Sequence, residues 1–445
     1  MINIKNIFIR LLSSNIIPSA ILLFFLGVFL LARTFMGIYI FGFRIGELAI
    51  LFSLLSLIIS ISFFNKFSYT KLFLNTKIRI TLILFVVTFI FNLILSASSP
   101  INPYTFKSSS YIWSIGFLFL GLYFANFYKL NKNIIRLFTI LNFYLYYFSF
   151  YGISEGVQNQ LLVISDKFEY HKGSDVFLLL ISSLFLMIRF EKEKRISLEI
   201  LLLTFSFFSP LLLYKSRGAF IGFLVFVLLE LFSLRRYFKM GYVRNMLLVI
   251  LMTILFLQSL SLVTKNGLIE VDEVRSNVDF ITSYREIPSS KIIEEKLFYM
   301  YENRLYSSDG NLNWRFQIWQ DVIHDLSLKN KLLFGYGYKS IIPAMDDPFR
   351  AGDDGTNENV HNFIVNIFAR GGLVHFLLFI LLFMQIFKYS SKFRDLKISH
   401  YIFPIFLVSF FDSSMENSHF PLIFYFIIGY LFQVNENALN KNEDS

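Results

Sequence analysis

Long apolar stretches, separated by short polar or basic segments, run through most of the chain. Many contain close to the roughly 20 apolar residues that an α-helix needs to cross the hydrocarbon core of a bilayer. The hydropathy pattern therefore predicts about twelve transmembrane helices. They are placed at residues 17–33, 46–64, 78–97, 109–128, 133–154, 174–190, 196–214, 217–234, 244–263, 371–389, 398–411 and 419–434.

One polar interval, residues 265–361, interrupts this pattern. It holds most of the acidic residues and two of the three tryptophans. The chain is thus predicted to be an all-α polytopic membrane protein, with one long, partly helical loop before the tenth predicted span. Its expected divisions are residues 1–263, the loop 264–370, the last helices 371–434, and a disordered polar tail, 435–445.

Lysine and arginine gather in every second connection, and these basic connections are expected to face the cytoplasm. Both chain ends then lie inside, and the long loop lies on the outer face. The basic residues are Lys66, Lys71, Lys77 and Arg79; Lys129, Lys132 and Arg136; Arg189, Lys192, Lys194 and Arg195; Arg235, Arg236, Lys239 and Arg244; and Lys388, Lys392, Arg394 and Lys397.

The composition agrees with a membrane protein, because 55% of the residues are hydrophobic and 16% are charged, against about 25% charged in soluble proteins. The net charge of +10 lies in the connections, without a basic face carrying stacking aromatics, so nucleic-acid binding is not expected. With no cysteine, disulfides and thiolate chemistry are excluded. No His-Glu-x-x-His metal motif or Gly-x-Ser-x-Gly elbow occurs.

The first candidate motif, Lys215-Ser216-Arg217-Gly218-Ala219, lies at the expected outer end between two predicted helices. An arginine beside hydrocarbon is costly unless it reaches the interface or an anion. Its planar guanidinium suits phosphate oxygens. Gly218 and Gly222 allow a neighbouring helix to approach closely. The alternative is an interfacial anchor with a packing glycine.

The second motif, Asn313-Trp314-Arg315-Phe316-Gln317-Ile318-Trp319, is predicted to begin an amphipathic helix that ends near residue 326. Arg315 and Trp319 are four residues apart and share one helix face. An indole and a guanidinium together could bind a sugar phosphate. The alternative is a surface helix with its tryptophans among lipid headgroups.

Two further motifs follow in the loop. Phe334-Gly335-Tyr336-Gly337-Tyr338 is a predicted turn, whose glycines allow positive φ or a close approach to a ligand. Asn359-Val360-His361-Asn362-Phe363 opens a short predicted helix at the junction with the membrane. Histidine is a common general base near neutral pH, although a lone histidine is more often a hydrogen-bonded structural residue.

Weaker candidate sites lie in two other connections on the expected outer face, and the alternative for them is solvated loop charges. Their residues are His171, Lys172, Asp412, Glu416 and His419.

The order of these motifs is more informative than any one of them. Ser-Arg-Gly-Ala opens a late helix; the loop carries Asn-Trp-Arg-x-x-x-Trp and then Gly-Tyr-Gly; His-Asn-Phe-Ile precedes a helix that starts with Gly-Gly. In this order the chain resembles the O-antigen ligase/O-antigen polymerase superfamily of bacterial envelope glycan enzymes. The resemblance covers residues 210–390 in motif detail, and the earlier helices only in number and hydropathy.

The resemblance implies a GT-C-like glycosyltransferase of the bacterial inner membrane, working on its outer face without a metal or nucleotide-sugar cofactor. The implied donor is an undecaprenyl-diphosphate-linked glycan, and the implied acceptor is lipid A-core or a growing glycan. Arg217 and Arg315 would bind the diphosphate, and His361 would be the base or orienting group for the acceptor hydroxyl. Lys215, Trp314, Trp319, Gly335, Tyr336, Gly337 and Asn362 are the further substrate-binding candidates.

Three readings remain open. A ligase is favoured over a repeat-unit polymerase, because the outer loop is single and long and ends in the His-Asn helix. A lipid-linked glycan flippase would place charges within several spans and show paired broken helices, whereas the motifs here gather at one face. A structural membrane scaffold is a third, minor option.

Overall fold

The computed structural model describes residues 16–63, 75–99, 102–151, 155–165, 171–238, 242–286, 297–301, 303–346, 350, 358–393 and 396–443. The predicted tail therefore lies within it up to residue 443. Parts of the predicted polar loop, residues 287–296 and 351–357, lie outside the described residues, as do Lys66, Lys71, Lys239 and Arg394 of the basic connections.

The described chain is mostly helical, as predicted. Its helices are α2 (Ile16–Gly37), α3 (Ile45–Phe63), α5 (Thr76–Leu95), α6 (Pro103–Ser108), α7 (Ser110–Trp113), α8 (Gly116–Phe127), α9 (Lys132–Tyr151), α10 (Glu155–Ile164), α11 (Gly173–Phe190), α12 (Lys194–Lys215), α13 (Arg217–Leu234), η1 (Arg235–Phe238), α14 (Tyr242–Glu286), α15 (Gly310–Leu328), η3 (Pro343–Met345), α16 (Phe363–Ser390), α17 (Ser399–Ser409), η4 (Ser414–Glu416) and α18 (His419–Glu443). Two small antiparallel hairpins, which were not predicted, pair β1 (Tyr39–Ile40) with β2 (Phe43–Arg44) and β3 (Phe298–Tyr301) with β4 (Arg304–Ser307).

Every predicted apolar segment overlaps a helix, but fewer than twelve meet the length and composition of a membrane span. Among the described residues, seven helices do so: Ser19–Gly37, Thr76–Leu95, Gly173–Phe190, Lys194–Lys215, Arg217–Tyr237, Tyr242–Lys265 and Phe363–Ser390. Three shorter apolar helices, Ile45–Leu55, Ser110–Asn126 and Ser399–Ser409, coincide with predicted spans. The chain is a multi-pass membrane protein.

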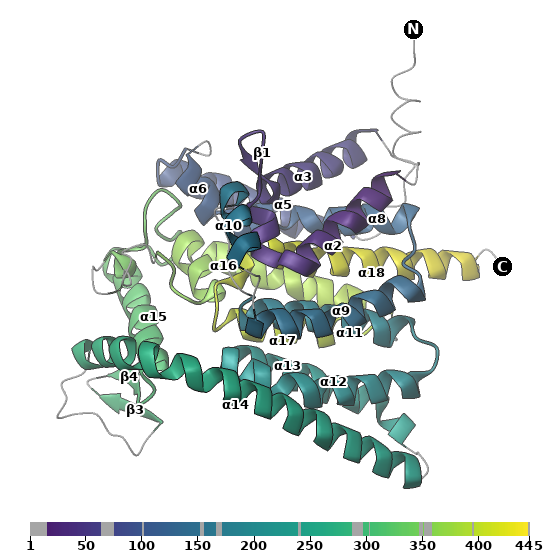
Figure 1. Cartoon of the computed structure of the whole chain (residues 1–445). Helices are drawn as coiled ribbons and strands as arrows, with labels where there is room; N and C mark the ends of the chain where they lie inside the picture. The colour runs from purple at the N-terminus through teal and green to yellow at the C-terminus, as the bar shows by residue number, and fades with distance from the viewer. Residues whose placement is uncertain are drawn as a thin grey trace.

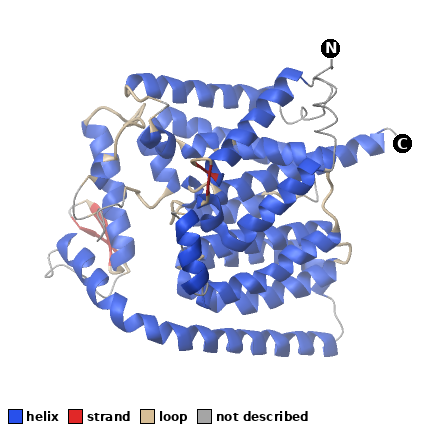
Figure 2. Cartoon of the chain, turned by 45° about the horizontal axis from the view of Figure 1, so that its top comes forward, coloured by secondary structure: helices blue, strands red, loops and turns tan. Residues whose placement is uncertain are grey.

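α14 and α18 extend beyond the predicted limits, whereas α16 joins the predicted short helix to the tenth predicted span. α14 runs for 45 residues, so the polar interval begins as helix. Figures 1 and 2 show α14 along one side of the bundle, with β3 and β4 beside its last part. α16 begins at Phe363 and is kinked at Gly372, where φ is 71°. The prediction of a disordered tail is wrong as far as Glu443, because α18 continues and the Tyr389 hydroxyl donates a hydrogen bond to Glu436 there.

The core of the bundle depends on close contact between α8 and α18. A Cβ on Gly121 would lie 2.1 Å from the carbonyl oxygen of Phe426, and one on Gly429 would lie 2.0 Å from that of Leu118. Only glycine allows two helix backbones to approach this closely. The contact fixes α18, whose first residue, His419, lies at the insert end of the molecule.

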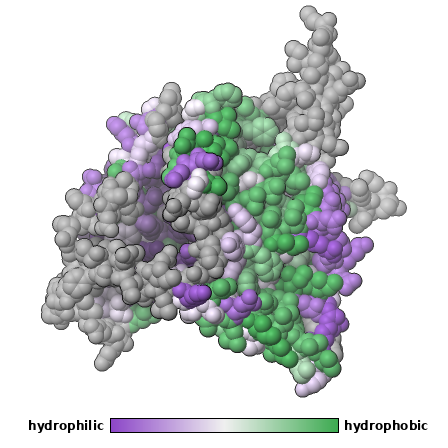
Figure 3. All heavy atoms as spheres, viewed as in Figure 1, coloured by the Kyte–Doolittle hydropathy of each residue, from purple (hydrophilic) through white to green (hydrophobic). Residues whose placement is uncertain are grey.

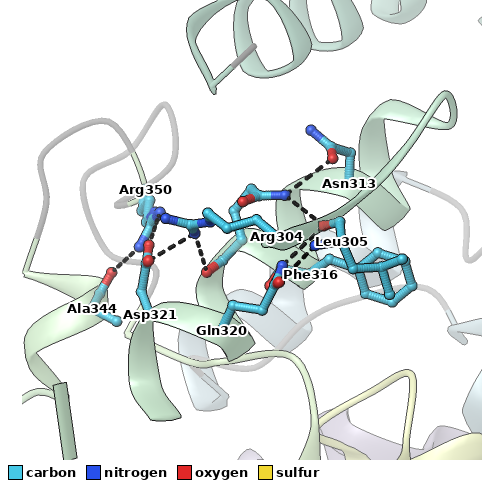
Figure 4. A network of polar contacts seen from close by, with 9 residues as sticks. Arg304, Leu305, Asn313, Phe316, Gln320, Asp321, Ala344 and Arg350 are labelled. Carbon is cyan, nitrogen blue, oxygen red and sulfur yellow. Dashed lines mark hydrogen bonds and ion pairs between the residues drawn. The ribbon is translucent and has the colours of Figure 1, made fainter. Parts of the chain in front are cut away.

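The polar insert has a small core of its own around α15. Asp321 on α15 accepts hydrogen bonds from Arg304 on β4, at 2.7 Å, and from Arg350, at 2.6 Å (Figure 4). Gln320 binds the backbone of β4 in both directions, accepting from the Leu305 amide at 2.8 Å and donating to its carbonyl at 2.9 Å. These contacts hold both the hairpin and the later loop against one helix.

Connections that were predicted to share the outer face contact one another at the insert end. Lys107 pairs with Glu358 at 2.7 Å, and Arg33 donates to the Asn417 side chain at 2.9 Å. These contacts join α2 and α6 to the segments that precede α16 and α18.

The basic connections contact one another at the opposite end. Lys132 and Arg136 both pair with Glu191, at 2.9 and 3.1 Å, and Lys397 donates to Ser233 at 2.6 Å. In Figure 3 apolar side chains cover the middle of the molecule and hydrophilic ones gather at its right-hand end, where Figure 1 places the end of α18, opposite the insert. The connections predicted to lie on one face of the membrane therefore gather at one end of the molecule, and those predicted for the other face gather at the opposite end.

Two single-cysteine variants test this arrangement, since the natural chain has no cysteine. Ser308 in the insert and Ser391 at the opposite end are both exposed. We expect a membrane-impermeant maleimide to label only one of Ser308→Cys and Ser391→Cys in intact cells, and to label both after permeabilisation. Equal labelling in intact cells would contradict opposite faces.

Candidate active site

A cavity of about 540 Å³ lies where the insert meets the helical bundle. Its wall comes from α2, α3, α6, the segment before α16, the first part of α16, and the connection between α17 and α18. The charged and imidazole groups that line it are Arg33, Arg44, Glu47, Lys107, Lys172, Glu358, His361, Arg370, Asp412, Glu416 and His419.

His361 lies in this wall just before α16 begins. Its φ of +50° is in the left-handed region, which costs a residue with a side chain of this size free energy. Asn362 caps the helix, because its side-chain oxygen accepts from the amides of Ile364 and Val365 at 2.9 and 3.0 Å. The Trp314 ring lies against the imidazole, with 5.0 Å between ring centroids.

The electrostatic environment keeps the His361 imidazole neutral at pH 7. Burial, aided by the positive charges of Arg315 and Lys172, lowers its pKa to about 4, although the nearby carboxylate of Asp412 acts in the opposite direction. A neutral imidazole can accept a proton or a hydrogen bond from a hydroxyl.

Trp319 positions this segment, and its ring is not open to a ligand. The ring is 7% exposed and lies in the core of the insert. Its indole N–H donates to the Val360 carbonyl at 2.8 Å, and the ring packs edge-on against Phe410. The predicted stacking of a sugar on Trp319 therefore does not fit this geometry, whereas Trp314, which is half-buried, lies directly beside His361.

Arg315 lies close enough to His361 for its charge to act on the imidazole. Its Nη1 donates to the Phe411 carbonyl at 2.6 Å. Burial lowers the pKa of the guanidinium, while the carboxylates of Asp412 and Asp309 oppose that shift. Arg315 is thus a partly buried cation between two carboxylates.

Arg217 is much more exposed, with 73% of its side chain accessible, and it forms an ion pair with Asp309. Asp309 also caps α15 by accepting from the Leu312 amide at 3.0 Å. Burial would raise the pKa of Asp309, but the Leu312 amide and the Arg217 guanidinium lower it. The structure therefore brings the three predicted residues, Arg217, Arg315 and His361, into one series of charges linked by Asp309 and Asp412.

The beginnings of α11 and α13 lie side by side near this series. A Cβ on Gly173 would lie 2.6 Å from the Cβ of Ser216. Ser216 caps α13 by accepting from the Ala219 amide at 3.2 Å, and Lys172 precedes α11. Helix N-termini bind anions through free amides and the helix dipole. Lys215, Arg217 and Lys172 surround this pair of N-termini.

Comparison with known families agrees with this arrangement. Residues 200–380 match the model of the O-antigen ligase family. This match supports the predicted resemblance to the O-antigen ligase/polymerase superfamily. The match includes Arg217, Arg315 and His361, and the insert that carries the last two. No curated protein matches the chain.

The predicted close approach by the glycines of α13 is confirmed. A Cβ on Gly218 would lie 3.1 Å from the Cβ of Phe411, and one on Gly222 would lie 2.4 Å from a methyl group of Val408. Gly218 and Gly222 therefore let α13 pack against α17 and the residues that follow it. This contact holds Arg217 close to the segment that Arg315 binds.

The Gly-Tyr-Gly turn also has the predicted backbone, with φ of +69° at Gly335 and +81° at Gly337. The groups that lie close to these glycines belong to other segments of this chain. A Cβ on Gly335 would lie 2.4 Å from the Arg370 carbonyl oxygen, and one on Gly337 would lie 2.2 Å from the Cβ of Ser96. The Tyr336 amide donates to the Ala369 carbonyl at 2.8 Å. In the structure the turn joins the insert to α16.

Several residues of the cavity were not predicted. Arg370 is 4% exposed; it donates to the Ser340 carbonyl at 2.9 Å and to the Tyr104 hydroxyl at 3.0 Å. His419, one of the weaker predicted sites, forms a buried pair at 2.6 Å with Asp175, which was not predicted. In the sequence, only its position before Gly371 and Gly372, at the start of a predicted span, could have marked Arg370 as a site residue. Among the described residues no cluster of three or more His, Asp or Glu could hold a metal ion.

Gly335→Ala tests the junction between insert and bundle. The added methyl group would meet the Arg370 carbonyl in a backbone conformation that disfavours alanine. We expect the free energy of unfolding to fall by roughly 2–4 kcal/mol, measured by denaturant unfolding in detergent.

The matched control is Gly156→Ala in α10, where no atom lies within 4 Å of the added Cβ. That variant is expected to stay within about 1 kcal/mol of the wild type. Equal stability of the two variants would contradict the proposed junction.

Proposed function

We propose that the chain is a membrane glycosyltransferase that transfers an undecaprenyl-diphosphate-linked glycan to an acceptor hydroxyl, as a ligase in the synthesis of surface polysaccharide. The observation that carries the proposal is the position of His361. It lies between the cationic site formed by Arg315 and the two helix N-termini, and a cavity large enough for part of a second substrate. The family match supports the same class of activity.

The donor diphosphate is assigned to the side of Arg217 and Arg315. The N-termini of α11 and α13 supply amides and dipoles there, and Lys172 and Lys215 add positive charge. As the bond between the sugar and the diphosphate breaks, negative charge grows on the leaving oxygen. A preorganised donor aimed at such charge often lowers the barrier by roughly 3–4 kcal/mol.

The acceptor is assigned to the cavity on the other side of His361. The neutral imidazole binds the attacking hydroxyl as base or orienting group, opposite the departing diphosphate, and the anomeric configuration inverts. No protein nucleophile takes part. Trp314 is the aromatic ring available to a sugar. Trp319 and Asn362 act by holding the backbone around His361. Gly335, Tyr336 and Gly337 act by holding the insert against the backbone of Ala369 and Arg370.

The location that fits this chemistry is the bacterial inner membrane, with the insert on its outer face. The basic connections at the opposite end would then be cytoplasmic. Of the two cysteine variants, Ser308→Cys is the one expected to react from outside.

Complementation of a bacterium that lacks this gene tests the function, read as surface polysaccharide on a gel. A ligase predicts loss of high-mass glycan from lipid A-core, with lipid-linked polymer accumulating, and restoration by the wild-type gene. Accumulation of a product with one repeat unit would instead show a polymerase that uses the same donor. Unchanged glycan would rule out both.

Arg315→Ala and His361→Ala test the mechanism in the same strain. Arg315→Ala is expected to lower the transfer rate by about 10²–10³-fold, because one preorganised donor is lost. His361→Ala is expected to lower it by about 10²–10⁴-fold if the imidazole handles the proton, and by less if it only orients the hydroxyl.

The matched control is Asp325→Asn on the same helix, α15, where an exposed ion pair with Lys329 is lost. That pair contributes little to stability, so near wild-type activity is expected. Full activity of both Arg315→Ala and His361→Ala would remove the mechanism and leave the family assignment intact.

A further inference from the structure

Glu416, the last residue of η4, lines the same cavity as His361. One carboxylate oxygen, Oε1, accepts a hydrogen bond from the Asn366 side chain at 2.8 Å. Within the described part of the chain the second oxygen, Oε2, accepts no hydrogen bond. It is accessible to solvent. The carboxylate is thus held on one side and open to the cavity on the other.

The charges around Glu416 come from several elements. Arg370 on α16 and Lys107 on α6 are positive, and Asp412 in the same connection as Glu416 is negative. Burial, reinforced by Asp412, raises the pKa of Glu416 to about 7 against the opposing effects of Arg370, Lys107 and the Asn366 amide. The carboxyl group therefore changes protonation state near neutral pH.

Three other acids line the cavity. Glu358 is paired with Lys107, Asp412 accepts from the Ser414 hydroxyl at 2.7 Å, and Glu47 accepts from the Arg44 amide at 3.1 Å. The imidazole of His361, with its pKa near 4, binds a proton about 10³-fold less tightly than a group whose pKa is about 7. A general base works best when its pKa lies near the operating pH.

We propose that Glu416 is the general base of the transfer reaction, and that His361 orients the acceptor hydroxyl. The assignment rests on the function proposed above. The ionised carboxylate of Glu416 takes the hydroxyl proton while the acceptor oxygen bonds to the anomeric carbon of the donor glycan. The bond from that carbon to the diphosphate breaks, its electron pair leaves with undecaprenyl diphosphate, and Glu416 later returns the proton to water.

The test measures initial transfer rates between about pH 5 and about pH 9. The purified full-length chain in lipid nanodiscs receives an undecaprenyl-diphosphate-linked glycan, with either lipid A-core or a second lipid-linked glycan as acceptor. The wild-type rate is expected to rise with pH through about 7, because only the ionised carboxylate accepts a proton. Glu416→Gln keeps an acceptor for Asn366 and is expected to lose this rise, with a rate about 10²–10⁴-fold lower at neutral pH.

Asn366→Leu tests the same proposal while the proposed base, Glu416, stays in place. The Asn366 amide stabilises the ionised form of Glu416, so its loss should raise the pKa of Glu416 and move the rise in rate to higher pH. A purely structural role of Glu416 would leave the position of the rise unchanged. Asp325→Asn, the control above, is expected to keep the wild-type profile.

The outcomes separate the two proposals. No transfer by the wild-type chain to either acceptor would overturn the proposed function and this assignment with it. Wild-type transfer, with an unchanged rise in Glu416→Gln or in Asn366→Leu, would overturn the assignment of Glu416 alone. We expect the rise of the transfer rate with pH to be lost in Glu416→Gln and to move to higher pH in Asn366→Leu.

Discussion

The rest of the structure depends on the break in α16 and the main-chain contacts that it allows. At Gly372 the helix leaves its regular path, and carbonyls that would bind within the helix become free. The amides of Tyr336 and Gly337 donate to the carbonyls of Ala369 and Arg370, at 2.8 and 3.0 Å, while the Leu373 amide donates to Leu332 at 2.8 Å. Unsatisfied backbone groups are costly at membrane depth, so the break and the insert stabilise each other.

The same junction determines where the candidate site lies. His361 lies just before the first part of α16, and Arg370 lies near the end of that part. The Arg370 side chain binds both the insert and Tyr104 on α6. Trp319 holds Val360 from the side of α15. The insert and α6 therefore meet at one short helical segment, and the cavity lies beside it, with further walls from α2, α3 and the connection between α17 and α18.

The sequence was sufficient for features that depend on local composition. Apolar length located the helices, and the motifs at Arg217, Arg315 and His361 marked residues that lie in one series of charges. Their partners Asp309 and Asp412 could not be predicted, because each pairing depends on tertiary contacts. Arg33 and Asn417, which border the cavity, are 384 positions apart. Trp319 was misread for a similar reason: a helix face is visible in the sequence, but not whether that face meets solvent or the insert's own core.

The way Asp321 joins Arg304 and Arg350 has a consequence for how the insert is kept together outside the hydrocarbon region. Exported loops are often cross-linked by disulfides, and this chain has no cysteine with which to make one. Here a single carboxylate bridges the hairpin and the later loop (Figure 4). The folding of the insert is therefore independent of oxidants and thiol-exchange catalysts, and its cross-link responds to ionic strength instead of to reductants.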